Sequence, residues 1–284
     1  MRLVAGLPYG VQLFIGRRLG DLMYLLSSRR RQVARINLEL CFPELDAGAR
    51  QRLLRLSFQS AGIMLTETAF SWWGSEARLR RLYRLEGIEH LNDALNQGKG
   101  VLLLGGHYST LEISGRFLAF HTKDLQPIYK PARNSLFNAV MVNSRSRLFD
   151  HLLLNRDMRT IIRNLKGNKV IWYAPDQDFP RAQTVFAPFM GIAAASLTMT
   201  SRLAKVSGAP VLPYYSQRLP GKQGYLIRLM PPLKDFPSGD DVTDLTQINQ
   251  AIEQQVRAAP EQYLWLHRRF KTRPPGEKEI YPPR

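Results

Sequence analysis

The chain has 284 residues, of which 44% are hydrophobic and 22% are charged, enough apolar material for a substantial core. Lysine and arginine total 40 against 23 acidic residues, a formal net charge of +17. This excess favours anionic partners, and nucleic acid, acidic phospholipid headgroups, phosphorylated glycolipids and acidic carrier proteins all qualify. The single cysteine, Cys41, excludes an intrachain disulfide, a multi-cysteine zinc site and a CxxC redox pair, and it indicates a reducing compartment.

The first 30 residues predict a helical segment associated with a membrane surface. Residues 3–26 are largely apolar, but Arg17, Arg18 and Asp21 interrupt them, so no stretch reaches the roughly 18 apolar residues of a spanning helix. Residues 29–31 are all arginine, which suits anionic headgroups. An amphipathic core helix explains the same periodicity equally well. No cleavage site of small residues follows, so a secretory signal is not expected.

The remaining pattern predicts an α/β fold with a mixed, largely parallel central sheet flanked by helices. A long helical pattern, in one helix or two, covers 46–74. Strands are expected at 82–85, 101–104, 125–129, 170–174, 211–215 and 225–230, and helices at 111–120, 135–149, 157–166, 193–206 and 242–259. We expect one domain over 31–274 and an extended tail, rich in proline and charge, over 275–284.

The segment 101–115, VLLLGGHYSTLEISG, carries the main candidate for catalysis. A buried strand ends in two glycines, which places His107 at its carboxyl end, where open α/β sheets bind ligands. A helix is expected to begin near Ser109. Five positions separate His107 from Glu112, about 140° apart if both were helical. If His107 lies in the turn before the helix, Glu112 reaches back, orients the imidazole and supports a general base.

Structural roles explain the same residues. Ser109 and Glu112 have the spacing of a capping box, in which both side chains bind backbone amides at a helix start. That role and the catalytic one are equally compatible with the pattern and can be combined. His107 is also compatible with a hydrogen-bonded histidine at a strand end, although the preceding glycine pair favours a function.

A second strand followed by a polar loop spans 170–191 and carries Asp176 and Asp178. One carboxylate could position Arg145 or a substrate hydroxyl, or simply cap the loop. A metal site is disfavoured because no histidine or further acid lies close by in sequence. Arg145 and Arg147 end a helical pattern, where a cation interacts favourably with the helix dipole, and they are alternatively suited to bind a phosphate.

The segment 263–273, YLWLHRRFKTR, interleaves aromatic and basic residues near the end of the chain. Such a segment is compatible with stacking on nucleic acid bases or with binding lipid phosphates. A solvated basic helix end is the structural alternative.

Taken together, these motifs resemble a known family. The segments are NLELCFPEL at 37–45, VLLLGGHYSTLE at 101–112, YKP at 129–131, WYAPDQDF at 172–179, VFAPFMG at 185–191 and YLWLHRRFKTRP at 263–274. In matching order over residues 17–274, they resemble the late acyltransferases of lipid A biosynthesis, the lauroyl and myristoyl transferases of Gram-negative bacteria.

The resemblance implies a fold like that of the glycerolipid acyltransferases, on the cytoplasmic face of the inner membrane. Its members move an acyl group from acyl carrier protein to a hydroxyl of a lipid A precursor bearing Kdo sugars. The family's catalytic dyad falls on His107 and Glu112, and two further functional positions, assigned to substrate binding, fall on Arg145 and Asp176. The implied partners are acyl carrier protein, a glycolipid acceptor and anionic inner-membrane lipids, without nucleic acid, metal or cofactor. Family members usually carry a hydrophobic anchoring helix upstream, which this chain does not fully show.

The expected chemistry is direct transfer, in which His107 deprotonates a lipid hydroxyl that attacks the acyl thioester. No GxSxG motif is present and Cys41 is distant in sequence, which disfavours an acyl-enzyme. Backbone amides near Gly105, Gly106 and the helix start are the expected oxyanion donors. Transfer to another glycolipid such as a phosphatidylinositol mannoside, hydrolysis of acyl thioesters, and nucleic-acid binding remain as alternatives.

Overall fold

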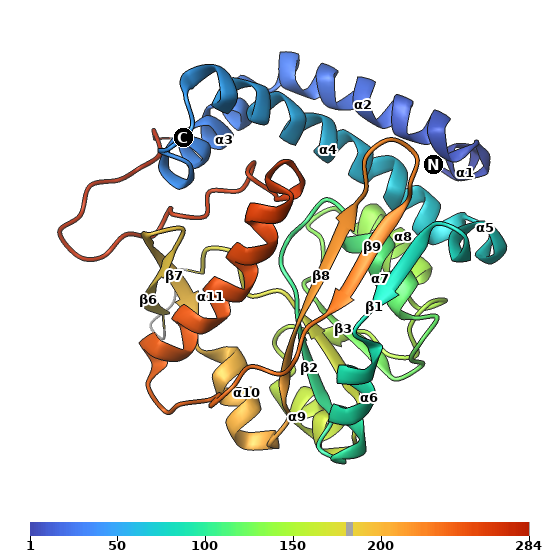
Figure 1. Cartoon of the computed structure of the whole chain (residues 1–284), viewed down its shortest axis with the longest axis vertical. Coiled ribbons are helices and arrows are strands. Elements are labelled where there is room, and N and C mark those ends of the chain that lie inside the picture. Colours follow the sequence, from blue (N-terminus) through green and yellow to red (C-terminus); the bar gives the residue numbers. More distant parts are fainter. Residues whose placement is uncertain (180–183, 284) are drawn as a thin grey trace.

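The computed structural model describes residues 1–179 and 184–283, and a seven-stranded mixed sheet forms its centre (Figure 1). The strand order is β1-β9-β8-β2-β5-β3-β4, and all neighbours are parallel except β8 and β9. The predicted mixed, largely parallel sheet flanked by helices is confirmed. The strands are β1 (Tyr83–Glu86), β2 (Val101–Leu104), β3 (Leu125–Tyr129), β4 (Leu153–Leu154), β5 (Val170–Tyr173), β8 (Val211–Arg218) and β9 (Tyr225–Leu229).

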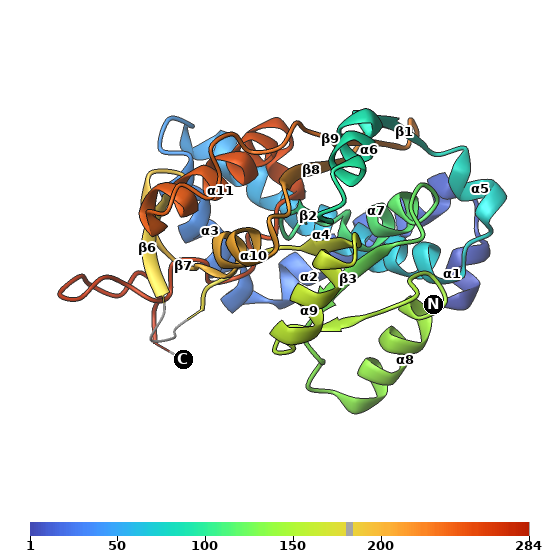
Figure 2. The same ribbon diagram turned by 90° about the horizontal axis from the view of Figure 1, so that it is seen from below.

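Strands β2 and β5 are continuous apolar runs because helices cover both faces of the sheet. Leu103 and Trp172 belong to the core beneath α6 and α7, whereas Leu102 and Ile171 belong to the core shared with α9, α10 and α11. Figure 2 shows α6 and α7 on one side of the strands and α10 and α11 on the other. The helices are α5 (Glu76–Arg80), α6 (Ile88–Asn96), α7 (Leu111–Leu118), α8 (Ser135–Arg145), α9 (Met158–Lys166), α10 (Met199–Ser207) and α11 (Asp241–Ala258), followed by a 3-10 turn, η1 (Pro260–Gln262).

Four N-terminal helices lie across the end of the molecule where β2 and β8 finish (Figure 1). They are α1 (Arg2–Gly6), α2 (Tyr9–Leu26), α3 (Ser28–Cys41) and α4 (Ala47–Trp73). The backbones of α2 and α4 touch, because a Cβ on Gly62 would lie 2.2 Å from the carbonyl oxygen of Gly16 and 2.3 Å from the amide nitrogen of Gly20. The N-terminal segment is therefore packed on the core. No helix in the described ranges combines the length and apolar character needed to span a membrane.

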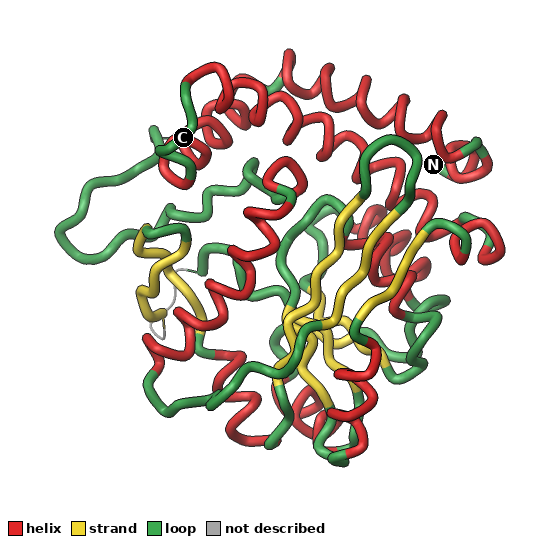
Figure 3. The backbone as a smooth tube through the Cα atoms, in the orientation of Figure 1, coloured by secondary structure: helices red, strands yellow, loops and turns green. Residues whose placement is uncertain are grey.

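The hairpin of β6 (Thr184–Phe189) and β7 (Ile192–Leu197) corrects the predicted helix at 193–206. It stands apart from the main sheet (Figure 3). The alanine-rich segment suggested a helix, but Met190 and Gly191 have φ values of 52° and 79°, which form a tight turn that folds 192–197 back onto β6. The predicted helix therefore begins only at Met199. Helix α8 ends at Arg145 instead of residue 149, and α3, α5, α6, β4 and β6 were not predicted.

The chain after Phe270 forms no helix or strand as far as residue 283. It is nevertheless fixed to the body, because the backbone amide of Phe270 donates to the Tyr281 hydroxyl at 3.1 Å and that hydroxyl donates to Asn37. Tyr281 is buried. Residues 275–279 of the expected tail are exposed.

Candidate active site

The turn after β2 places His107 at the carboxyl end of the strand, as predicted. The amide of Gly105 continues the sheet by donating to the carbonyl of Tyr173 at 2.9 Å. Glycine is required at this position, since a Cβ on Gly105 would lie 2.9 Å from Nε1 of Trp172 and 3.2 Å from the Tyr214 ring. His107 follows two residues later, before α7 begins at Leu111.

A buried carboxylate holds the His107 imidazole. Nδ1 of His107 lies 2.5 Å from Oδ1 of Asp176, and the His107 amide donates to Oδ2 of the same carboxylate at 2.8 Å. The Asp176 side chain is fully buried, whereas that of His107 is 30% exposed. Because an ionised carboxylate only accepts hydrogen bonds, the imidazole proton lies on Nδ1, and the lone pair on Nε2 is available as a base.

The ionisation of Asp176 depends on this contact. Burial by itself raises the pKa of a carboxyl group, but the charge of His107, its two hydrogen bonds and the charge of Arg269 together lower the pKa of Asp176 to about 2. Asp176 is therefore an anion at neutral pH. An anion in this position stabilises a protonated imidazole, which is what a histidine general base forms.

Glu112 is hydrogen-bonded to residues other than this pair. Its carboxylate accepts from Nε1 of Trp72 at 2.9 Å and from both Nε and Nη2 of Arg145, which grips the two oxygens. The hydrogen bond to the imidazole that we expected from Glu112 comes from Asp176 instead. The physical reason is that α7 starts at Leu111, so the first turn of the helix directs Glu112 toward α4 and α8.

The predicted capping box is also wrong. Ser109 does not cap α7, because its hydroxyl lies 2.8 Å from the Ser60 hydroxyl on α4. Thr110 is the residue at the cap position, and it makes no side-chain capping bond. The Glu112 carboxylate is committed to Arg145 and Trp72. A capping role therefore does not explain why an acid stands at position 112.

The two arginines near the end of α8 differ in surroundings. Arg145 is in the last turn, as the dipole argument allows, and its side chain is only 14% exposed against Glu112 at 16%. It pairs with Glu112 and not with Asp176, the carboxylate we considered for it. Arg147 follows the helix and is exposed.

Residues 262–273, which we call the C-terminal strap, bind both loops of the site. The amide of Leu264 donates to the carbonyl of His107 at 3.0 Å. The amide and hydroxyl of Thr272 donate to the two carboxylate oxygens of Asp178, at 3.0 and 3.1 Å. The strap thus connects the turn at His107 with the loop that carries Asp176.

Part of the strap is buried, so the alternative of a solvated basic helix end is wrong for Arg269. Arg269 is 3% exposed, and it donates to the carbonyl of Ala195 at 2.8 Å and to the Ser196 hydroxyl at 3.1 Å. The pKa of His267 is lowered to about 4 by burial and then by the charge of His107, which places His267 beside the site. The interleaved aromatic residues were the available signal for this, because aromatic side chains are commonly buried.

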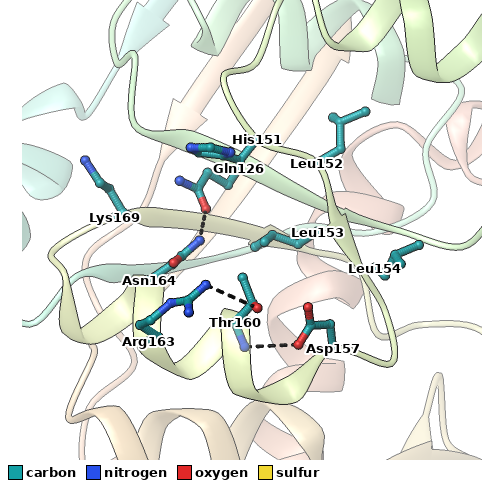
Figure 4. Close-up of a pocket in the computed structure, with 10 residues that line it drawn as sticks. All are labelled: Gln126, His151, Leu152, Leu153, Leu154, Asp157, Thr160, Arg163, Asn164 and Lys169. Atoms are coloured by element: carbon teal, nitrogen blue, oxygen red, sulfur yellow. Dashed lines mark hydrogen bonds between the residues drawn. The ribbon is translucent and has the colours of Figure 1, made fainter.

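Among the described residues, no three His, Cys, Asp or Glu side chains gather as metal ligands. A surface pocket of about 300 Å³ lies elsewhere, beside β4 and α9 (Figure 4). Two polar residues that line this pocket are already hydrogen-bonded within the protein: Asn164 donates to Gln126 at 2.7 Å, and Lys169 donates to Asp124 at 2.5 Å. The site chemistry accordingly rests on the turn at His107.

An imidazole oriented by a buried carboxylate, at the carboxyl end of a largely parallel sheet, defines an α/β protein equipped for acid–base chemistry. Residues 1–272 match the family model described as bacterial lipid A biosynthesis acyltransferase, and the chain belongs to this family. The resemblance inferred from the motifs is confirmed.

Individual relatives match along nearly the whole chain. A lipid A biosynthesis lauroyltransferase of Escherichia coli K12 is 37% identical over 280 residues, covering 98% of this chain and 91% of the relative. The lipid A biosynthesis palmitoleoyltransferase of the same organism is 36% identical over 276 residues, covering 97% and 90%. A lipid A biosynthesis acyltransferase of Haemophilus influenzae is 32% identical over 277 residues, covering 96% and 88%.

Proposed function

We propose that the protein transfers a fatty acyl chain from acyl carrier protein to a hydroxyl group of a Kdo-bearing lipid A precursor, on the cytoplasmic face of the inner membrane. The observation that carries the proposal is the Asp176–His107 pair, which supplies an oriented base at the ligand-binding end of the sheet. The names of the relatives, which include lauroyl and palmitoleoyl transferases of lipid A, support the choice of acceptor and donor chain.

His107 acts as the general base. Its Nε2 takes the proton of the acceptor hydroxyl while that oxygen attacks the thioester carbonyl carbon. The tetrahedral intermediate then collapses, the carbon–sulfur bond breaks, and the leaving thiolate takes the proton from the imidazolium. Asp176 stabilises the imidazolium in between, so the acyl group passes directly from sulfur to oxygen.

The oxyanion of that intermediate needs a hydrogen-bond donor, and the structure narrows the choice. Most amides of the turn already donate within the described residues: that of Gly105 to Tyr173, of His107 to Asp176, of Tyr108 to Gly106, and of Ser109 to Gln262. The amides of Gly106 and Thr110 make no such bond in that part of the chain. Because Gly106 directly precedes His107, we assign the oxyanion to the Gly106 amide.

Glu112 and Arg145 form the second functional pair. Glu112 occupies Nε and Nη2 of Arg145, which fixes the guanidinium in a plane. The Nη1 group makes no hydrogen bond within the described residues and is offered to a phosphate or carbonyl oxygen of the substrate. Glu112 thus serves catalysis by positioning Arg145.

The N-terminal helices form the proposed membrane-facing surface, the apolar face. Most of the large apolar side chains exposed in the described residues lie here, including Leu3, Phe14, Leu22, Leu25 and Leu26 of α1 and α2 and Leu56 and Leu65 of α4. Contiguous exposed apolar surface marks an interaction site. The neighbouring arginines, at 17, 18 and 29–31, suit the phosphates of an anionic leaflet.

Purified protein, acyl carrier protein loaded with a fatty acid, and a Kdo-bearing lipid A precursor test the proposal by mass spectrometry. The expected product is the precursor with one added acyl chain. Release of free fatty acid at the same rate with and without acceptor would identify a hydrolase. Acylation of a phosphatidylinositol mannoside in preference to the lipid A precursor would show that the proposed acceptor is wrong.

A further inference from the structure

The first turn of α8 exposes two adjacent apolar side chains. Leu136 is 74% exposed and Phe137 is 50% exposed. Exposed Lys130 and Arg133 precede them. Beyond residue 73, the described residues expose just two other large apolar side chains, Val206 and Val242, which are not adjacent. Adjacent apolar side chains that are exposed to water often mark a binding surface, and the two nearby cations favour an anionic partner.

This pair lies beside the end of helix α4, separate from the apolar face. The ring of Phe137 lies 6.4 Å from that of Trp72, near the end of α4. Trp72 in turn donates to Glu112, and Arg145 at the other end of α8 binds the same carboxylate. Helix α8 therefore joins an exposed apolar tip to the candidate active site.

We propose that residues 130–137, the α8 tip, bind the surface of an anionic membrane. Leu136 and Phe137 enter the boundary between headgroups and acyl chains, and Lys130 and Arg133 pair with lipid phosphates. This second attachment is distinct from the N-terminal helices and rests on the membrane location in the proposed function. Two attachments fix the orientation of the protein, with Glu112 and Arg145 held near the bilayer from which a lipid acceptor arrives.

An environment-sensitive fluorophore placed by Leu136→Cys reports the contact. Native Cys41 is buried and its burial raises the pKa of the thiol, so it does not compete for the label. With vesicles of phosphatidylglycerol and phosphatidylethanolamine, emission at position 136 is expected to shift to the blue and rise. The control is Val206→Cys on α10, at the end of the molecule opposite α2 and α4 (Figure 1).

Affinity provides a second readout. The double variant L136S/F137S is expected to bind the same vesicles about tenfold more weakly, because the apolar area that enters the membrane is lost. The matched control V206S/V242S removes two apolar side chains of similar exposure, 52% and 47%, and is expected to bind within about twofold of wild type. Thermal unfolding checks that all four variants are folded.

Each outcome decides the proposal. If the wild type binds vesicles but the emission of the label at position 136 does not change and L136S/F137S binds as tightly as the wild type, the proposed α8 contact is wrong. The proposed function is then unaffected. A label that responds to a soluble acyl thioester and not to vesicles assigns the tip to a substrate chain, which also overturns it. Absence of vesicle binding by the wild type removes both this contact and the membrane location of the proposed function.

Discussion

Nδ1 of His107 lies 2.5 Å from Oδ1 of Asp176, a residue 69 positions further along the chain. Strand pairing creates this contact. In the register of β2 and β5, Leu104 is opposite Tyr173, and each of the two site residues follows its strand by three positions. The neighbouring carboxyl ends of two parallel strands therefore bring the imidazole and the carboxylate together.

Asp176→Asn is expected to lower acyl transfer by about 10²–10⁴-fold, because the amide does not stabilise the imidazolium and favours the wrong tautomer. Steady-state rates over pH 5 to 9, with circular dichroism as the check on folding, measure the effect. A variant that is folded and as fast as wild type would show that this carboxylate has no part in the reaction.

Glu112→Gln and Arg145→Lys are each expected to lower kcat/KM by about 10–100-fold, since both break the two-point grip that fixes the guanidinium. Because the residues act as one unit, the double variant should lose little more than either single variant. Losses that multiply in the double variant would mean that Glu112 and Arg145 act independently.

His267 predicts a loss of stability on mild acidification. Its pKa is about 4 in the folded protein against 6.5 for an ordinary histidine, because of burial and the charge of His107. Below 6.5 the unfolded chain binds a proton that the folded protein does not, so stability falls as the pH drops from 6.5 to 4. His267→Gln is expected to flatten the dependence of Tm on pH in this window. An unchanged slope would contradict this assignment.

Thr272→Val removes the hydroxyl bond to Asp178 at nearly constant volume and is expected to cost about 1 kcal/mol of stability. If the strap holds the Asp176 loop, kcat should fall as well while KM changes little. Thr246→Val is the control, since it removes an exposed hydroxyl bond within α11, to the carbonyl of Val242, that involves no residue of the strap. Equal kcat values for the two variants would argue that the strap does not position the site.

Gly62→Ala is expected to separate α2 from α4, because the added methyl group would lie 2.2 Å from a backbone oxygen that cannot move alone. A loss of about 1–3 kcal/mol, as in overpacked cores, should appear in urea unfolding. Gly6→Ala meets nothing within 4 Å and serves as the control. If both variants unfold at the same urea concentration, the close helix contact is not needed.

Much of the fold follows from local patterns. The bounds of β2 and β3 agree with the predicted strands, and Asp46 starts the long helix α4 by accepting from the amide of Ala49. The β6–β7 hairpin did not follow, because β7 contains three consecutive alanines, at 193–195, whose helical propensity is overridden by pairing with β6. Tertiary contacts therefore determine the secondary structure of these residues.

Part of the candidate site was likewise predictable from the sequence and part was not. His107 was identifiable because a glycine pair after a buried strand marks a ligand-binding turn. Its partner was not, since the choice of Asp176 over Glu112 depends on β5 lying beside β2, and sheet order is a long-range property. The role of the strap depends on residues 262–273 returning to both loops, which no local pattern encodes.

The role of His107 as the base is tested most directly by His107→Gln, measured as single-turnover acyl transfer from acyl carrier protein to the lipid A precursor. The variant is expected to fold and to bind the acceptor, and to transfer the acyl chain about 10²–10⁴-fold more slowly than wild type across pH 5 to 9. Transfer by the folded variant at the wild-type rate would contradict the account.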